Sequence, residues 1–444
     1  MNKTFRHGVL AMAIAAAMPV LAQVPLEATR KQGATLEATL GAERTDNAFK
    51  TSFREEDETK SYIDLGLGYR RSGDILDADV LYHGELANYE NDTTDDDTVL
   101  TGSGRVSWKL LPDRLQLDLS HERSEQLRDS RNPDIRNNRI LRDIVTAGPT
   151  FRARMSPVDA LVVSGRYVAV SYDDSDRTPI GGAQNSDSER TQGSLGWEHS
   201  FSETDVLSLH YEYMDTEFDS FTEEFQYQRL FATYAVRLRQ SGYSISVGAN
   251  RSERDSTGSN DGFLVRANWN LQTGEHQFRL NGVNELTDSG IGLGGSTEGG
   301  GLQLPDSNFD VIDVVERSSI DFDWQYGGVC ERCSVSLGVF YDDQDFDTQP
   351  RDQEQIGYRG SFGYRLTPTL TAALTGSYAE SEYTQDVGGG RRDERTGYGI
   401  TLDWELSRSL SMRAWLMQDE RDSDDFGQEY NELYGGLSLR YTFR

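Results

Sequence analysis

Strict alternation of apolar and polar residues is the feature that most constrains the fold of this 444-residue chain. It is clearest in residues 34–42, 63–70, 115–120 and 398–406, where every second side chain is Ala, Leu, Ile, Tyr or Trp. In a helix this spacing would scatter the apolar side chains around the axis, whereas a strand places them all on one face. The pattern therefore predicts an all-β protein whose strands each have one apolar face.

Short and long connections also alternate along the chain. The long ones are polar and acidic, and they include residues 45–58, 91–97, 173–188, 287–312, 342–354 and 419–428, with two more near Asp143 and Phe225. The short ones are turns at residues 71–74, 111–114, 156–159, 202–205, 240–242, 272–275, 326–328, 367–369 and 407–409. Short periplasmic turns that alternate with long extracellular loops are typical of bacterial outer-membrane barrels, which have an even number of strands. The sequence thus predicts a transmembrane, antiparallel, up-and-down β-barrel of about 20 strands, within a range of roughly 18–22.

The N-terminus predicts a secretory signal peptide. Lys3 and Arg6 precede an apolar run, and residues 20–22 form a small-x-Ala cleavage site. No later segment has the run of about 18 apolar residues that a membrane-spanning helix needs. We therefore expect residues 1–22 to be a signal peptide, 23–33 a short periplasmic segment and 34–444 the barrel. The expected location is the outer membrane of a Gram-negative bacterium.

The composition fits such a barrel and argues against one class of partner. The formal charge is −30, and removal of Lys3 and Arg6 with the signal peptide makes the mature chain still more acidic. A strongly acidic chain is not expected to bind nucleic acid. The mean hydropathy of −0.64 suits a barrel, because only alternate strand residues face lipid while the loops are polar.

Aromatic residues recur at one depth of the predicted barrel. Five of the six tryptophans lie on the apolar face a few residues before a short turn, and two tyrosines hold the equivalent place. Amphipathic rings at a shared depth indicate a membrane-interface girdle. The predicted girdle consists of Tyr69, Trp108, Trp197, Trp269, Trp324, Tyr364 and Trp404. The alternative, core tryptophans of a soluble β protein, does not explain their common distance from one class of turn.

Charged residues occupy the opposite, inward face of the predicted strands. The alternation assigns to the pore lining Arg105, Arg152, Arg154, Arg166, Arg229, Arg237, Arg266, Arg279, Arg359, Arg365, Asp321, Asp323, Asp403, Glu405 and the aromatic Trp415. Opposed basic and acidic walls would orient a polar solute, and the planar guanidinium group of arginine suits carboxylates, phosphates and sugar hydroxyls. The alternative is that these charges neutralise one another in a narrow lumen. The inward Trp415 can stack on a sugar ring or pack against the wall.

Two further features allow weaker predictions. Cys330 and Cys333 form a CxxC motif, which in an oxidising compartment can close as a disulfide on a turn; a redox or metal site is the alternative. Acidic runs at residues 55–58, 95–97 and 342–345, and again at 422–425, are expected in extracellular loops. There they can hold divalent cations near lipopolysaccharide, or simply be solvated. No other cofactor or metal is expected.

Nothing in the sequence indicates an enzyme. There is no GxSxG elbow, and the acids near His83 and His210 on the inward face are ordinary strand residues. An outer-membrane hydrolase acting at the barrel rim is retained only as a minor alternative.

The C-terminal part resembles a known family. The similarity lies in residues 364–371 (YRLTPTLT), 402–411 (LDWELSRSLS), 430–432 (YNE) and 437–443 (LSLRYTF), which cover much of the last 100 residues or so. These motifs resemble outer-membrane β-barrel porins encoded near exopolysaccharide and PEP-CTERM exosortase loci. The alternating C-terminal strand also resembles the signal that the barrel assembly machinery reads, although Arg444 follows the aromatic Phe443 here. The resemblance implies a barrel that assists polysaccharide export, with no catalytic residues to carry over.

Two functions follow from these observations. The first is a porin-like barrel that passes polar solutes or assists exopolysaccharide export. The second is a non-conducting structural or assembly barrel whose acidic loops bind cell-surface components or a partner. The expected partners are outer-membrane lipid, lipopolysaccharide, the assembly machinery and a polysaccharide.

Overall fold

The computed structural model describes residues 32–129, 131–173, 187–219, 224–254, 258–288, 313–384 and 390–443. The predicted signal peptide and nearly all of residues 23–33 lie outside this part of the chain. The strands are β1 (Gly33–Thr45), β2 (Glu58–Arg71), β3 (Leu76–Tyr89), β4 (Asp97–Leu111), β5 (Leu115–Leu127), β6 (Arg139–Arg154), β7 (Asp159–Asp173), β8 (Ser188–Ser200), β9 (Asp205–Phe218), β10 (Glu224–Arg237), β11 (Ser241–Arg254), β12 (Gly258–Thr273), β13 (His276–Asp288), β14 (Val314–Tyr326), β15 (Cys333–Phe346), β16 (Gln353–Thr367), β17 (Leu370–Tyr383), β18 (Arg391–Glu405), β19 (Leu410–Ser423) and β20 (Tyr430–Phe443).

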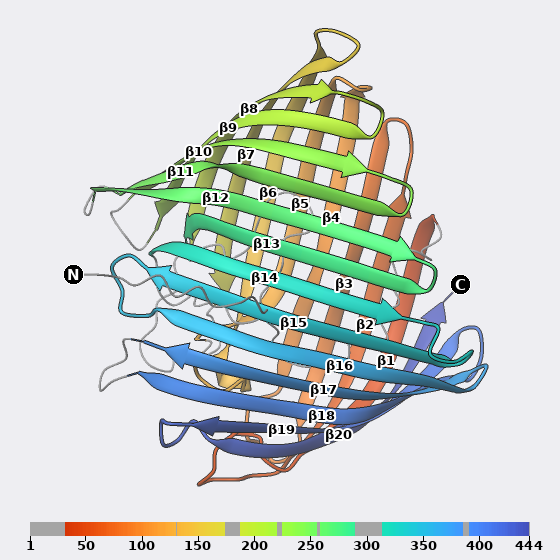
Figure 1. Cartoon of the computed structure of the whole chain (residues 1–444). Coiled ribbons are helices and arrows are strands. Elements are labelled where there is room, and N and C mark those ends of the chain that lie inside the picture. The colour runs from red at the N-terminus through yellow and green to blue at the C-terminus, as the bar shows by residue number, and fades with distance from the viewer. Residues whose placement is uncertain are drawn as a thin grey trace.

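These strands form one closed antiparallel sheet. Each strand pairs with its neighbours in sequence, and β1 closes the ring by pairing with β20 from Leu36–Phe443 to Thr45–Tyr434. The strands of the near wall cross those of the far wall at a large angle, as tilted barrel strands do (Figure 1). The predicted 20-stranded up-and-down barrel is confirmed, and all nine predicted short turns fall between consecutive strands.

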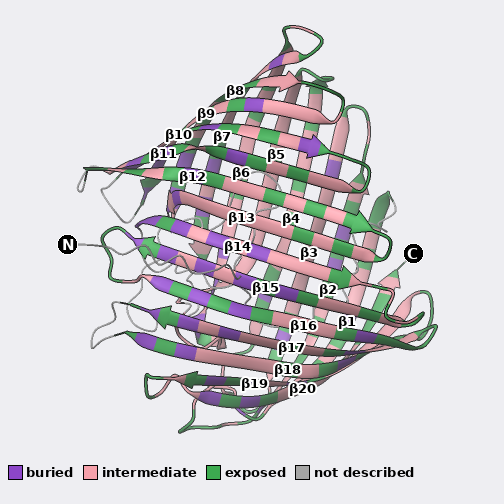
Figure 2. Cartoon of the chain, in the orientation of Figure 1, coloured by how far each residue is buried: buried purple, intermediate pink, exposed green. Residues whose placement is uncertain are grey.

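The alternation places apolar side chains outside and polar ones inside. In β2, Leu65 and Leu67 are 51% and 54% exposed on the outer face, whereas Asp64 lines the interior. Exposed residues alternate with half-buried or buried ones along many of the strands, and the buried residues gather toward the end with the long loops (Figure 2). No helix among the described residues is long and apolar enough to cross a membrane.

Several predicted loop boundaries were wrong. Residues 342–345 belong to β15, and Asp422 belongs to β19, rather than to extracellular loops. Likewise, Asp143 lies within β6 and Phe225 within β10. The strands continue beyond the apolar belt because their charged side chains find partners there, as buried Asp342 does with Arg317 (2.8 Å).

Two hairpins turn into the barrel at its extracellular end. Pairing between β4 and β5 stops at Gly102–Arg123, although β4 continues beside β3 and β5 beside β6. Pairing between β12 and β13 stops in the same way at Val265–Asn284, while β13 continues beside β14. The extracellular ends of β5 and β6, and of β13 and β14, thus leave the wall, and they shape the interior described next.

Candidate functional site

The interior holds one large cavity that runs along one side of the barrel. Its volume is about 1540 Å³, and its lining comes from β1–β6, β15–β20, and the β1–β2, β3–β4, β5–β6 and β14–β15 connections. At the periplasmic end it is lined by Arg332 and Glu405, and at the extracellular end by Lys50 and Asp134. The lining therefore extends from the short turns to the long loops.

Opposite charges nearly balance in this lining. It contains eleven Asp and Glu residues and ten Lys and Arg residues. Many of them pair across neighbouring strands, as Lys60 does with Glu85 (2.7 Å) and Arg413 with Asp403 (2.6 Å). A cavity with almost no net charge favours polar solutes without strong selection for their sign.

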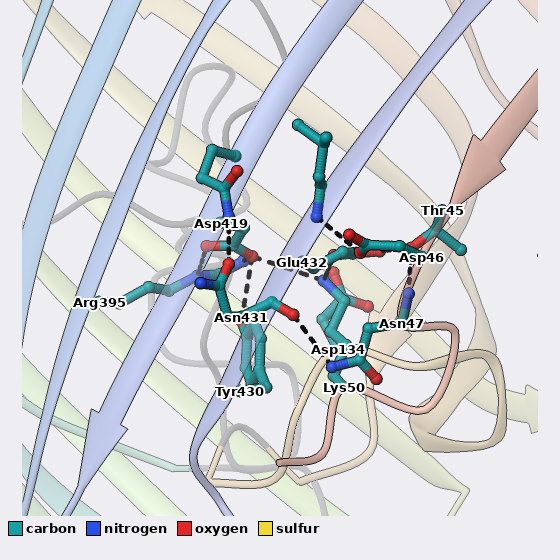
Figure 3. Close-up of polar contacts among 12 residues, drawn as sticks. Thr45, Asp46, Asn47, Lys50, Asp134, Arg395, Asp419, Tyr430, Asn431 and Glu432 are labelled. Atoms are coloured by element: carbon teal, nitrogen blue, oxygen red, sulfur yellow. Dashed lines mark hydrogen bonds and ion pairs between the residues drawn. The ribbon is translucent and has the colours of Figure 1, made fainter. Parts of the chain in front are cut away.

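A buried ion cluster caps the cavity at the extracellular end. Lys50, from the β1–β2 loop, lies 3.0 Å from Glu432 of β20 and 3.5 Å from Asp419 of β19 (Figure 3). Asp419 also accepts hydrogen bonds from Arg395 (2.7 Å) and the Tyr430 hydroxyl (3.0 Å). The carboxylates and the ammonium group are at most 13% exposed, so their attraction is weakly screened. We call Lys50, Arg395, Asp419, Tyr430 and Glu432 the cap cluster.

The β1–β2 loop is further held by hydrogen bonds to β20. The Asn47 side chain is 1% exposed and donates to the carbonyls of Thr51 (2.9 Å) and Asn431 (3.0 Å). The Asp46 amide donates to the Leu433 carbonyl, and the Leu433 amide donates to the Asp46 carboxylate (2.8 Å). These bonds seat the loop against the inner wall (Figure 3).

The tip of the β5–β6 hairpin reaches the same region from another part of the ring. Arg391 of β18 and Arg421 of β19 each donate a 2.8 Å hydrogen bond to the Arg131 carbonyl in this tip. Burial opposes ionisation of Asp134 in the tip, but Arg139, Lys50 and Arg395 outweigh it and hold the pKa of Asp134 at about 2. The tip therefore spans the lumen and presents an anion to the cap cluster.

The rest of the interior is filled at its extracellular end. Arg190 of β8 makes two hydrogen bonds of 2.6 and 2.7 Å to Asp288 of β13, and both side chains are only 2% exposed. Phe225 and Leu264 are completely buried nearby, and Arg229 donates to the Leu286 carbonyl. The described ends of β13 and β14 thus pack against β8, β9 and β10, on the side of the barrel that the large cavity does not occupy.

Several of the residues predicted to line a pore pair with opposite charges. Arg152 pairs with Glu198, Arg229 with Glu212 (3.9 Å), Arg266 with Glu285 (2.6 Å), and Arg359 with Asp321 and Asp323. These contacts favour mutual neutralisation over an uncompensated transverse field.

The remaining predicted pore residues are more scattered. Arg365, Asp403, Glu405 and Trp415 line the large cavity, and Arg279 lines a recess of about 150 Å³ together with Asp323. Within the described chain, the large cavity does not include Arg105, Arg154, Arg166 or Arg237 in its lining.

The predicted girdle residues lie on the outer face near the short turns. Trp108, Trp404 and Tyr69 are 48%, 43% and 40% exposed there, and Trp197 and Tyr364 are both 37% exposed. Trp269 and Trp324 are less exposed because other rings cover them; Trp324 stacks on His276, and Trp269 on Phe278.

The other predicted chemical groups are separate from one another. Cys330 and Cys333 are joined by a disulfide in the β14–β15 turn, with their Cα atoms 5.0 Å apart. His83 contacts Asp64 (3.1 Å) and His210 contacts Ser208 (2.8 Å), so neither contact joins a serine, a histidine and an acid. Among the described residues, no group of three or more His, Cys, Asp or Glu is arranged to hold a metal ion.

Sequence reasoning missed the cap cluster. Lysine is rare in the chain beyond the signal peptide, where only Lys31, Lys50, Lys60 and Lys109 occur. Of these, Lys50, Lys60 and Lys109 each pair with a carboxylate in the structure. A lysine in an otherwise acidic loop was therefore the sequence feature from which a buried ion pair could have been predicted.

A closed antiparallel barrel with an apolar outer face and a polar interior is a porin-like β-barrel of the Gram-negative outer membrane. In agreement, the model of a family described as "Putative outer membrane beta-barrel porin, MtrB/PioB" matches residues 344–434, from the end of β15 into β20. No match was found among curated proteins.

Solved outer-membrane barrels are similar in outline. The siderophore receptor PirA from Acinetobacter baumannii is 12% identical, with a TM-score of 0.48 over 93% of this chain and 81% of the receptor. OccK2 (OpdF) from Pseudomonas aeruginosa is 15% identical, with a TM-score of 0.41 over 93% of this chain and 100% of that protein.

Proposed function

We propose that the barrel is a channel that passes polar solutes or assists the export of an exopolysaccharide, and that it has no catalytic role. The observation that carries the proposal is the cavity whose polar lining extends from Arg332 and Glu405 at the periplasmic turns to Lys50 and Asp134 at the extracellular loops. Its balanced charge suits hydroxylated or zwitterionic solutes. The resemblance of residues 364–371, 402–411, 430–432 and 437–443 to porins encoded near exopolysaccharide loci motivates the second role.

Planar-bilayer recording of the purified, folded protein tests the channel. The wild type should give small conductance steps, because the cap cluster narrows the extracellular end. Lys50→Met should give larger or more frequent steps, because it frees the β1–β2 loop from Asp419 and Glu432. Arg251→Ala, at an exposed pair with Glu253, is the matched control and should leave the steps unchanged. Absence of steps in both the wild type and Lys50→Met would rule out a channel.

A second candidate is a non-conducting structural or assembly barrel. The filled interior around Arg190, Asp288 and Phe225 favours it, because such packing stabilises a plug. In this case neither the wild type nor Lys50→Met would give conductance steps. Deletion of the gene would change the composition of the cell surface without changing solute uptake.

A further inference from the structure

Two aromatic side chains lie against the inner wall of the cavity where the barrel closes. Trp415 projects from β19 over Gly436 of β20, and Tyr62 projects from β2 over Gly41 of β1. Both rings line the cavity and are half-buried. They approach the β1–β20 seam from its two sides, and Ser438 of β20 lies opposite Gly41, the residue that the Tyr62 ring covers.

The two glycines make this arrangement possible. A Cβ atom at Gly436 would overlap the benzene edge of the indole of Trp415, and one at Gly41 would overlap the phenol of Tyr62. Each ring therefore occupies the space that a side chain of the neighbouring strand would otherwise fill. The result is an aromatic surface that lies close against the wall, with the open cavity in front of it.

Hydrogen-bonding groups surround the aromatic surface. Gly436 lies opposite Glu43 in the strand register, and Glu43 lies opposite Lys60. The Lys60 ammonium is 5.0 Å from the centre of the Tyr62 ring and 2.7 Å from Glu85. On the next row, Ser438 lies opposite Arg413. The Lys60 ammonium thus lies over the Tyr62 ring, and the other donors and acceptors lie beside the two rings in the strand register.

This combination has the chemistry of a sugar site. A pyranose ring has faces of C–H groups that pack on an aromatic ring, and hydroxyls at its rim that need both donors and acceptors. The lining has eleven acidic and ten basic residues, so its nearly neutral net charge does not favour a charged ligand over a neutral one. We propose that Trp415 and Tyr62 form a binding subsite for a neutral pyranose within the channel. The proposal rests on the channel function and names its substrate class.

The alternative to a sugar site is that the contacts of Trp415 and Tyr62 with glycines only stabilise the barrel wall. Phe340 lies over Gly357 and His83 over Gly66 elsewhere in the barrel, so such contacts also stiffen the wall. A structural role predicts that loss of a ring lowers stability without affecting sugar binding. Binding and stability must therefore be measured separately.

Calorimetric titration of the folded protein in detergent measures binding without requiring conduction. The probes are neutral hexasaccharides of β-1,4-glucose, α-1,4-glucose and β-1,4-mannose, with hexagalacturonate as the charged comparison. At least one neutral probe should bind, Trp415→Ala should weaken it about tenfold or more, and Trp415→Phe should retain most of the affinity. Gly41→Ala, whose added Cβ would displace the Tyr62 ring, should also weaken binding.

The matched controls are Gly193→Ala, where an added Cβ meets nothing within 4 Å, and Trp108→Phe on the outer face, outside the cavity lining. Both should bind as the wild type does. The proposal fails if no neutral probe binds at about 10 mM, if only hexagalacturonate binds, or if Trp415→Ala stays folded and binds normally. Sugar binding without bilayer conductance would contradict the channel function and support the subsite. Bilayer conductance without sugar binding would support the channel function and contradict the subsite.

Discussion

Replacement of Lys50 by Met tests whether the cap cluster holds the β1–β2 loop inside the barrel. The Lys50 side chain is 13% exposed, and its partners Asp419 and Glu432 are 8% and 7% exposed. Removing one partner of a buried ion pair costs about 3–5 kcal/mol, because the remaining charge stays buried. Arg395 still pairs with Asp419 here, so the lower end of about 3 kcal/mol applies, equivalent to about 100-fold in the docking equilibrium.

Hydrogen–deuterium exchange of residues 45–58 measures this equilibrium directly. The Asp46 amide bonds to the Leu433 carbonyl of β20, so it reports on docking, and the Ala48 amide bonds to the Glu56 carbonyl within the loop, so it reports on the loop's own order. Exchange of the Asp46 amide should accelerate by about 100-fold in Lys50→Met if local opening limits exchange. Adding Glu432→Gln should restore part of the protection, because it removes one uncompensated charge. Arg44→Ala, which breaks a pair whose side chains are 71% and 55% exposed, should change exchange by only a few-fold at most. If Lys50→Met exchanges no faster than Arg44→Ala, the cluster does not hold the loop.

Three further predictions follow from individual contacts. Arg190→Ala should lower the free energy of unfolding of the barrel by about 3–5 kcal/mol, because it leaves the buried Asp288 carboxylate without its partner. Arg190→Met combined with Asp288→Leu should recover most of this loss. Equal stability of Arg190→Ala and the wild type would contradict the buried pair. Docking of the β5–β6 tip should be insensitive to pH from about 5 to 9 and should weaken only as the pH falls toward 2. The pKa of Asp134 is lowered to about 2, so its carboxylate stabilises docking fully at pH values above the ordinary pKa of an aspartate. This stabilisation is lost as Asp134 becomes protonated. Exchange of residues 128–138, corrected for intrinsic rates, measures this, and release at pH 5 would refute it. Reduction of Cys330–Cys333 should lower stability by no more than about 2 kcal/mol, because the disulfide closes a very short loop; collapse of the barrel on reduction would contradict this.

The alternating pattern was sufficient to predict the barrel, its strand number and its turns. A period of two fixes which face each side chain occupies, and the turn residues mark where the chain reverses. The strand ends beyond the lipid belt were not predictable in this way. There Asp342 and Arg317 pair inside the barrel, so a charged residue no longer signals a loop.

The same limit applies to the interior. Periodicity placed Trp415, Arg365 and Asp403 on the inward face, but it could not indicate that the extracellular ends of β5 and β13 separate from β4 and β12. Contacts such as Arg421 with the Arg131 carbonyl join residues 290 positions apart, and no local pattern encodes them. The cap cluster and the division of the lumen therefore emerge only from the tertiary structure.

Accessibility of a cysteine at the periplasmic end of the cavity tests the central claim most directly. Ser411→Cys lines the cavity near the short turns, whereas Leu402→Cys on β18 faces outward and is the lipid-facing control. A small, membrane-impermeant thiol reagent added outside intact cells that carry Lys50→Met should label Ser411→Cys and leave Leu402→Cys unlabelled. If Ser411→Cys is labelled only after the cells are permeabilised, the cavity is not a continuous path and the channel account is wrong.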